Sequence, residues 1–189
     1  CRGPPVAGWA SVDGPARRGG TAARPRFGGR SWTLRRIWGR TRGRAERGAQ
    51  QRRAAGTPAV ATTTPAATLD GADVVCTLTP SQEPFLSRRM LGADAHVNAV
   101  VSPPRPVFSA VPADVFAAAR VVVVDDAAVA LAESGNIRGA CATGVLQPAE
   151  LVSLGEALDA GGASDRRGIT VFNSVGLGIQ DLYAAHVLC

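Results

Sequence analysis

Guanidinium and hydroxyl groups at the ends of apolar segments are the residues of this chain best suited to hold a ligand. Arg40 and Thr41 follow the short alternating run 34–38, and Thr77 and Thr79 end the next long apolar run. An Arg side chain presents a fork of N–H donors that suits phosphate oxygens. Because the hydroxyl groups add further donors, these residue types predict a site for a phosphorylated ligand.

Two other polar positions follow or interrupt apolar runs. Asn98 lies among apolar residues, and a buried amide needs hydrogen-bond partners, so both a structural bond and a ligand contact stay open for it. The pair Asp125 and Asp126 ends the run 121–124. Two buried neighbouring acids would have raised pKa values, but capping of the next helix is the favoured interpretation. No Ser/His/Asp arrangement accompanies these residues.

The apolar runs that precede these residues predict a parallel sheet. Residues 74–76 form an unbroken apolar run between turn residues, which is typical of a strand buried on both faces, with a buried helix as the competing interpretation. Strands alternating with helices at this spacing indicate βαβ units, whose ligands bind at the carboxyl ends of the strands. The predicted strands are 34–38, 74–76, 95–101, 121–124 and 169–172, and the predicted helices are 41–55, 64–69, 112–120, 127–133, 147–159 and 175–188.

Within such a sheet, the turn at Arg40 and Thr41 bears on the choice of nucleotide. In a dinucleotide fold an acid at this turn binds the 2′-hydroxyl of NAD. Arg and Thr suit a 2′-phosphate instead, so the turn favours NADP over NAD. The Gly-rich phosphate loop expected before the strand 34–38 is absent, because FGG at 27–29 lacks the spacing.

Charge divides the chain into two parts. All 21 basic residues are Arg; residues 1–53 hold 14 of them against two acids, and residues 54–189 hold 7 against 13. Residues 1–32 are rich in Gly, Ala, Arg and Pro without an apolar period, which predicts a disordered basic tail. A nucleic-acid-binding arm, an unstructured tail and a stretch translated from a shifted reading frame all stay open for this segment.

Cysteine, histidine and hydropathy exclude several classes of protein. The four Cys and two His lie too far apart for a zinc pattern, so we predict no bound metal. No apolar stretch approaches the roughly 18 residues that cross a membrane, and no secretory signal is visible. Cys76 fits a small apolar residue inside a strand. We therefore expect a cytoplasmic protein without a membrane partner. Since the chain begins at Cys1, we also expect it to be a fragment or a processed product.

Seven segments together resemble the ornithine cyclodeaminase/mu-crystallin family in order and spacing. The most specific is the last, where a strand, an FNSVG turn and a helix with IQD follow one another. The resemblance covers about residues 33–188 and leaves out the tail. The segments are RIWGRT (36–41), GADVVCTLTPSQEPFL (71–86), GADAHVNAV (92–100), VVVVDD (121–126), ALAESGNI (130–137), ELVSLGEAL (150–158) and ITVFNSVGLGIQDLYAAHV (169–187).

This resemblance implies a Rossmann domain that binds NAD or NADP in a homodimer. The family's shared chemistry is hydride transfer between an amino acid carbon and nicotinamide through an imine, so the implied small-molecule partner is an amino acid or a cyclic imine. The implied cofactor-binding residues are Arg40 and Thr41 at the 2′-phosphate, Thr77, Thr79 and Asn98 along the cofactor channel, and Ser174 and Gly176 near the nicotinamide, where amide N–H groups can meet it.

Departures from the family pattern concern catalysis. The family's amino-terminal half, which supplies the dimer interface and holds the substrate carboxylate, has no counterpart in residues 1–32. Val101 replaces a Gly, Pro103 and Pro104 stand where some members have a catalytic Asp, and Asn173 replaces a frequent Lys. Imine chemistry needs a positioned proton donor, and no residue is assigned that role. We therefore expect little or no turnover.

The sequence thus predicts a disordered tail over 1–32 and a partial NAD(P)-binding Rossmann domain over 33–189. Its predicted function is amino acid or imine chemistry, by ornithine cyclodeamination or ketimine reduction. A non-enzymatic NADPH-binding or small-ligand-binding protein is the first alternative. Nucleic-acid binding through the tail is the less favoured one, and it predicts an affinity that falls steeply with salt.

Overall fold

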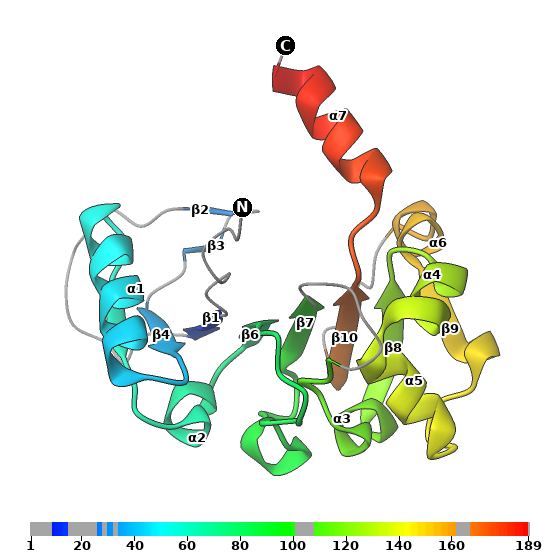
Figure 1. Cartoon of the computed structure of the whole chain (residues 1–189), viewed down its shortest axis with the longest axis horizontal. Coiled ribbons are helices and arrows are strands. Elements are labelled where there is room, and N and C mark those ends of the chain that lie inside the picture. Colours follow the sequence, from blue (N-terminus) through cyan, green and yellow to red (C-terminus); the bar gives the residue numbers. More distant parts are fainter. Residues whose placement is uncertain are drawn as a thin grey trace, which may run out of the picture.

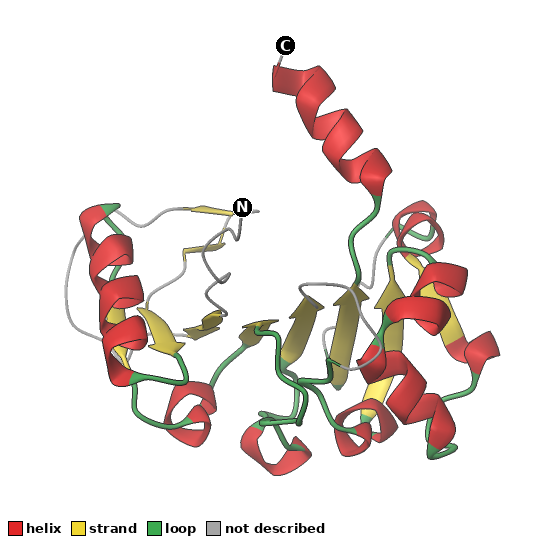
Figure 2. Cartoon of the chain, viewed as in Figure 1, coloured by secondary structure: helices red, strands yellow, loops and turns green. Residues whose placement is uncertain are grey.

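The computed structural model describes residues 9–14, 26–27, 30–31, 34–100, 108–161 and 167–188. Strands and helices alternate along them, and Figure 2 shows the strands in a row across the molecule. Val101, Pro103 and Pro104 lie outside the described residues. The strands are β1 (Trp9–Gly14), β2 (Arg26–Phe27), β3 (Arg30–Ser31), β4 (Leu34–Trp38), β5 (Ala59–Ala61), β6 (Val74–Leu78), β7 (His96–Val100), β8 (Ala119–Val124), β9 (Leu151–Ser153) and β10 (Ile169–Ser174). The helices are α1 (Arg42–Ala54), α2 (Pro65–Leu69), α3 (Ala113–Ala117), α4 (Ala127–Glu133), α5 (Gly135–Ala142), α6 (Leu154–Asp159) and α7 (Gly178–Leu188), with short 3₁₀ turns η1 (Arg88–Met90) and η2 (Pro148–Glu150).

One sheet organises these elements, with the strand order β5-β4-β1-β6-β7-β10-β8-β9 (Figure 1). β6, β7, β10, β8 and β9 are parallel to one another, and β4 is parallel to β5. Because β4 and β6 both pair antiparallel with β1, they also point in one direction. Every strand of this sheet except β1 therefore ends at the same edge, which confirms the predicted α/β fold with a parallel sheet.

The strand β1 differs from the prediction of a disordered tail over residues 1–32. Its six residues lie between β4 and β6 and pair with both. β2 and β3 form a further antiparallel pair. The inner edges of β4 and β6 carry backbone N–H and C=O groups that need partners, and an extended segment can satisfy them whatever its side chains. Composition therefore could not reveal this pairing; the rest of the predicted tail lies outside the described residues.

Several helix starts follow from capping residues that the sequence displays. Thr64 accepts a hydrogen bond from the Ala67 N–H at the start of α2, and Pro65 takes the first helical position. Thr41 is the N-cap residue of α1, although its side chain makes no capping bond. The helices predicted over 41–55 and 64–69 are therefore confirmed to within one or two residues.

No helix was predicted between residues 133 and 147, but the structure has one there, α5. Ser134 ends α4 in an extended conformation and at once caps α5, because its hydroxyl accepts from the Ile137 N–H. The Ser-Gly pair thus starts a second helix instead of only ending the first. A residue with extended φ and ψ angles can serve both roles, which a linear pattern does not show.

The helix predicted over 147–159 is also wrong in its first half. Residues 148–150 form the turn η2, Leu151–Ser153 pair with β8 as β9, and only Leu154–Asp159 are helical. Ser153 and Glu156 form a capping box that fixes the true helix start. The Leu spacing had indicated a longer helix, but pairing with the sheet edge satisfies more of the backbone. The edge strand β5 was not predicted either.

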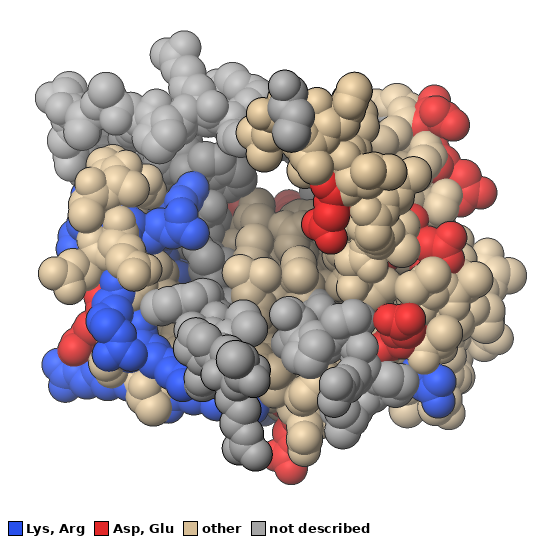
Figure 3. Space-filling view, turned by 45° about the horizontal axis from the view of Figure 1, so that its top comes forward, with Lys and Arg blue, Asp and Glu red and all other residues tan. Residues whose placement is uncertain are grey.

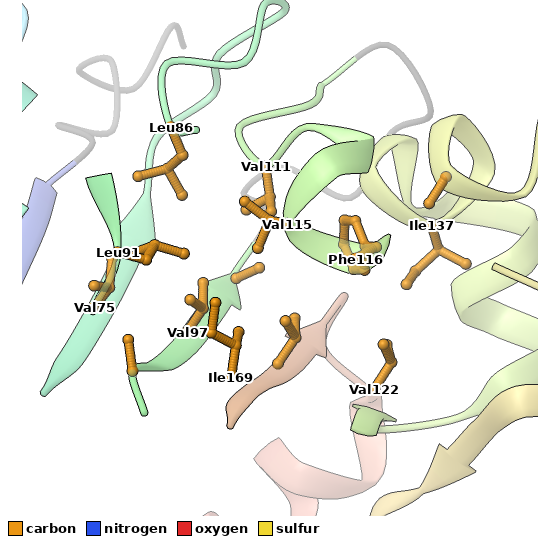
Figure 4. Close-up of a cluster of buried hydrophobic side chains, with 14 of the residues drawn as sticks. Val75, Leu86, Leu91, Val97, Val111, Val115, Phe116, Val122, Ile137 and Ile169 are labelled. Atoms are coloured by element: carbon orange, nitrogen blue, oxygen red, sulfur yellow. The ribbon is translucent and has the colours of Figure 1, made fainter. Parts of the chain in front are cut away.

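The main core lies on one face of the parallel strands. Figure 4 shows Val115 and Phe116 of α3 and Ile137 of α5 packed toward Val97 and the neighbouring strand residues. Buried and half-buried residues alternate along β6, β7 and β10, as two-residue periodicity requires. The opposite face is less covered, as the half-burial of its side chains shows. These side chains include Val74, Cys76, His96, Asn98, Thr170 and Phe172.

The last helix, α7, extends away from the sheet in Figure 1. A helix was predicted over 175–188, and α7 confirms most of it. None of the described residues of α7 is buried, and Ile179 and Leu182 are 69% and 70% exposed. Across the described residues, no helix combines the length and the hydropathy that a membrane span needs.

Candidate functional site

The carboxyl ends of the parallel strands bring four polar segments to one edge of the sheet. The turn after β4 carries Arg40, the segment after β6 carries Thr79, β10 ends at Ser174, and β8 is followed by Asp125. The corresponding segment after β7, residues 101–107, lies outside the described residues. Because β4 and β10 are four strand spacings apart, the edge from Arg40 to Ser174 is about 19 Å long.

Arg40 joins the turn after β4 to the segment after β6. Its guanidinium donates a hydrogen bond of 3.2 Å to the Ser81 hydroxyl, which in turn donates one of 2.6 Å to the Glu83 carbonyl. Trp38 and Phe85 reinforce this junction, with ring centroids 5.1 Å apart. Arg40 is otherwise exposed, so its remaining N–H donors can meet an anion. Sequence reasoning missed Ser81, since an isolated Ser after a strand gives no signal.

Thr77 and Thr79 are both buried at the end of β6. The Oγ1 atom of Thr79 has no hydrogen-bond partner among the described residues, although Thr79 is only 5% exposed. A buried hydroxyl without a partner costs about 1–3 kcal/mol. An unsatisfied donor and acceptor at this edge is what a site for a polar ligand would contain.

Asn98 lies apart from Thr77, on the other face of the sheet. It pairs in register with Cys76, whereas Thr77 is the next residue along β6 and points to the buried face. The Asn98 amide donates to the Cys76 sulfur at 3.6 Å, and its oxygen lies 3.2 Å from His96 Nε2. Both amide atoms thus have protein partners, so the structure supports the structural interpretation that the sequence left open.

His96 completes this chain of side chains at the amino-terminal end of β7. Its Nδ1 lies 2.7 Å from the Thr170 hydroxyl. Since Asn98 Oδ1 can only accept, Nε2 carries the proton and Nδ1 accepts from Thr170. Burial lowers the pKa of His96, and the hydrogen bond to Asn98 opposes that effect. Burial thus favours the neutral imidazole, which lies at the end of the strand far from Arg40 and Ser174.

The turn Ser174–Val175–Gly176 is fixed by the carboxylate of Asp125. Oδ2 of Asp125 accepts from the Ser174 hydroxyl at 2.9 Å, the Val175 N–H at 3.0 Å and the Gly176 N–H at 2.9 Å. Gly176 has a φ of +82°, which favours Gly. The Gly176 N–H, predicted to face the nicotinamide, is therefore occupied by Asp125.

Asp126, by contrast, fulfils the predicted capping role. Its Oδ1 accepts from the Val129 N–H at 2.8 Å at the start of α4. The two neighbouring acids thus act on different elements. The sequence analysis treated the two acids as one pair. Only one residue can be the N-cap of a helix, so the sequence could have indicated that the other acid has a different role.

A buried polar cluster behind β10 was also missed. Asn173 is fully buried; its Oδ1 accepts from Asn136 Nδ2 at 3.0 Å, and its Nδ2 donates to the Ser134 hydroxyl at 3.1 Å. Asn136 Oδ1 accepts from the N–H groups of Ala110 and Val111 at 2.9 and 3.1 Å. The cluster ties β10 to α5 and to the segment before α3. Among the described residues, no group of three or more His, Cys, Asp or Glu could hold a metal ion.

The strand order places a switch point between β1 and β6. Numbered along the chain within this sheet, the first five positions read third, second, first, fourth and fifth. This is the order of dinucleotide-binding sheets, in which the ligand lies across the point where the order reverses. The fold and the polar edge thus define a Rossmann-like α/β protein.

A sequence model of the ornithine cyclodeaminase/mu-crystallin family matches residues 31–189. The chain belongs to this family. It is 33% identical to a Delta(1)-pyrroline-2-carboxylate reductase of Bacillus cereus over 135 residues, which are 69% of this chain and 41% of the relative. It is 32% identical to the ketimine reductase mu-crystallin of Mus musculus over 154 residues, which are 81% of this chain and 45% of the relative.

A solved structure shows the same fold. The Delta(1)-pyrroline-2-carboxylate reductase of Thermococcus litoralis, in complex with NADH and L-proline, superposes with a TM-score of 0.73 at 22% identity, over 80% of this chain and 47% of that one. The resemblance to the family and the predicted Rossmann-like fold are therefore confirmed. The chain spans less than half the length of each of these relatives.

Proposed function

We propose that this chain binds a nicotinamide dinucleotide across the carboxyl edge of its sheet, with NADP preferred to NAD. Arg40 and Thr41 would hold the 2′-phosphate, Thr77 and Thr79 the middle of the cofactor, and the turn at Ser174 the nicotinamide end. When bound, this group supplies or accepts a hydride. The family and the NADH in the Thermococcus litoralis structure support a nicotinamide cofactor.

The unpartnered hydroxyl of Thr79 is the observation that carries this proposal. It lies buried at the end of β6, beside the strand-order switch where a dinucleotide crosses the sheet. A phosphate or ribose oxygen there would give the hydroxyl the hydrogen bond it lacks among the described residues. Asn98 was also predicted to line this channel; its satisfied amide and its position on the other face give that part of the prediction no support.

The preference for NADP rests on the chemistry of Arg40. One N–H of its guanidinium is engaged by Ser81, and the group has five N–H donors in all. An exposed guanidinium with unused donors can make a charge-assisted contact to a 2′-phosphate. The hydroxyl of Thr41, which makes no capping bond, can add a second contact.

The affinities for NADPH and NADH, measured by titration calorimetry, test the proposal. Replacing Arg40 by Ala should weaken NADPH binding about 10- to 100-fold and leave NADH binding nearly unchanged, as expected for loss of a charged hydrogen bond. Arg42→Ala is the matched control, because Arg42 is an exposed neighbour that pairs with Glu46 at 2.7 Å. A wild-type chain that binds neither nucleotide contradicts the proposal.

The family relationship suggests amino acid or cyclic imine chemistry at the cofactor. The relatives above are named for the reduction of a pyrroline carboxylate and of ketimines, and we propose an imine or its amino acid counterpart as the ligand class. Such a reaction needs a proton donor near neutral pKa. In the described part of the chain, His96 lies at the far end of β7 and His186 in the projecting helix α7.

This arrangement favours a second candidate, a non-enzymatic NADPH-binding protein. We expect NADPH binding with little or no turnover of ornithine or of a cyclic ketimine by this chain. A spectrophotometric assay at the absorbance band of NADPH, with each compound in turn, decides between the two. Rapid turnover of either compound contradicts the expectation of impaired catalysis and supports an enzyme.

Nucleic-acid binding stays a prediction that the structure does not test. Figure 3 shows Arg side chains gathered at the side of the molecule where α1 lies, and α1 carries five Arg residues against one Glu. Arg-rich surfaces on helices are often only solvated. Weak binding of an oligonucleotide at low salt that is lost at physiological salt would indicate a purely electrostatic contact.

A further inference from the structure

The carboxylate of Asp125 is the best-connected polar group at the candidate site. It accepts from the Ser174 hydroxyl and from the N–H groups of Val175 and Gly176, all within 3.0 Å. The donors come from three consecutive residues at the end of the neighbouring strand β10 and just after it, 49 to 51 positions further along the chain. A carboxylate that gathers three consecutive donors fixes the path of that segment more firmly than any single bond could.

The other roles open to Asp125 belong to other residues. Capping of α4 is done by Asp126. The hydrogen bonds of Asp125 point instead to the turn, and its Oδ1 also accepts from the Asp126 N–H at 3.3 Å, which holds the carboxylate in place.

The shape of the turn depends on these bonds. Gly176 adopts a φ of +82°, in the region that residues with a side chain rarely enter, and no atom lies within 4 Å of a Cβ placed there. Space therefore does not explain the Gly. The left-handed backbone lets two successive N–H groups converge on one carboxylate, as in a small anion-binding nest. Here the anion is part of the protein.

We propose that Asp125 is a positioning residue that fixes the Ser174–Val175–Gly176 turn for the nicotinamide end of the cofactor. This inference rests on the proposed function. It also refines it, because the N–H groups of Val175 and Gly176 are consumed by Asp125 and are not offered to the nicotinamide. The turn then selects its ligand by the position of its backbone, about 19 Å along the sheet edge from Arg40.

The experiment compares Asp125→Asn with the matched variant Asp126→Asn in the full chain. An Asn side chain keeps one acceptor oxygen but replaces the other by an NH₂ donor and removes the negative charge, so in either orientation of the amide the bonds to the turn lose their charge assistance. At position 126 Asn caps a helix as well as Asp does. Each variant is titrated with NADPH and with adenosine 2′,5′-bisphosphate, which has the 2′-phosphate but no nicotinamide.

We expect Asp125→Asn to weaken NADPH binding about tenfold or more, as for loss of hydrogen bonds to a charged group. Binding of adenosine 2′,5′-bisphosphate should stay unchanged, and Asp126→Asn should change neither. A general disturbance of the folded structure would weaken the binding of both ligands. Unchanged NADPH affinity in Asp125→Asn, or equal losses for the two ligands, overturns the proposal.

Hydrogen–deuterium exchange without nucleotide separates this inference from the proposed function. The amides of Val175 and Gly176 should exchange about tenfold faster in Asp125→Asn than in the wild type. If the wild type binds neither ligand, the proposed function fails, whereas faster exchange of these amides in Asp125→Asn still supports the role of Asp125 in fixing the turn. Unchanged exchange in Asp125→Asn overturns that role. If Asp125→Asn does not fold, the variant Ser174→Ala removes one donor alone. A selective loss of NADPH affinity in Ser174→Ala supports the proposal. An unchanged NADPH affinity in that variant overturns it.

Discussion

Removal of the Asn173 side chain should test the buried polar cluster that supports the candidate site from behind. Asn173→Ala breaks the bond from Asn136 Nδ2 and the bond to the Ser134 hydroxyl, and both partners are buried with it. Water cannot replace these bonds unless it enters the space left by the amide. The expected result is a large loss of stability from one small polar side chain.

The magnitude follows from the groups left unsatisfied. A buried polar group without a partner costs about 1–3 kcal/mol, and the variant leaves one on Asn136 and one on Ser134. With the lost packing of the amide, the free energy of unfolding should fall by about 3–5 kcal/mol. Since a domain of this size is stable by about 5–15 kcal/mol, the variant should unfold at markedly lower urea concentration.

A double-mutant cycle with Asn136→Ala isolates the contact between the two amides. Asn136→Ala also releases the N–H groups of Ala110 and Val111, so it should be at least as destabilising. The double variant should cost about 1–2 kcal/mol less than the sum of the single variants, because the same bond is counted in both. Unfolding in urea, followed by Trp fluorescence, measures all three.

Asn98→Ala provides the control. Its amide also has two side-chain partners, but it is only half-buried, so water can take their place. Its cost should be about 1 kcal/mol. Equal costs for Asn98→Ala and Asn173→Ala, or strict additivity of the Asn136 and Asn173 variants, would refute the reasoning that burial makes the cluster behind β10 important.

Three further predictions concern single positions. Since burial lowers the pKa of His96 below its ordinary value of 6.5, the unfolded chain binds the proton more readily than the folded chain. The free energy of unfolding should therefore be fully retained above pH 6.5 and should decrease below it. His96→Gln should reduce this decrease when urea unfolding is compared at about pH 5 and about pH 8. Gly176→Ala and Gly144→Ala both place a side chain at positive φ in open space, and each should cost about 1–2 kcal/mol of stability. In calorimetry, only Gly176→Ala should weaken NADPH binding. An equal loss of NADPH affinity in Gly144→Ala would contradict a local role of the turn at Gly176. Ser153 hydrogen bonds lower the pKa of Glu156, so Ser153→Ala should raise that pKa toward its ordinary value in an NMR titration, and an unchanged pKa would contradict the capping box.

The sequence was sufficient for the elements that a single physical signal determines. Apolar residues predominate in β6, β7 and β8, with Thr77, His96, Asn98 and Arg120 as the polar exceptions, and turn residues lie near their ends. It failed where two signals compete. Leu151, Leu154 and Leu158 have helical spacing, yet Leu151 belongs to an edge strand, because pairing with β8 is a long-range interaction that local periodicity does not contain.

The candidate site was predictable to the same extent. Residue type and strand position were enough to select Arg40, Thr79 and Ser174, which the structure places at one edge. The hydrogen-bond partners of Arg40 and Ser174 could not be predicted. These partners, Ser81 and Asp125, follow other strands of the sheet, and only the sheet pairing brings them close. Asn98 was predicted to contact the cofactor because a buried amide needs hydrogen-bond partners. The amide does have such partners, but they are His96 and Cys76 within the sheet.

The strand β1 has a consequence for how the cofactor's phosphates can be held. In a dinucleotide-binding sheet, the first strand runs parallel to its neighbours and delivers a Gly-rich loop to the switch point. Here β1 is antiparallel to β4 and β6, so its carboxyl end lies at the opposite edge of the sheet. The described residues that reach the switch point therefore come from β4 and β6, chiefly Arg40 and Thr79. The groups that the described residues offer there are one guanidinium and one hydroxyl, so we expect binding to depend on the 2′-phosphate far more than on the pyrophosphate.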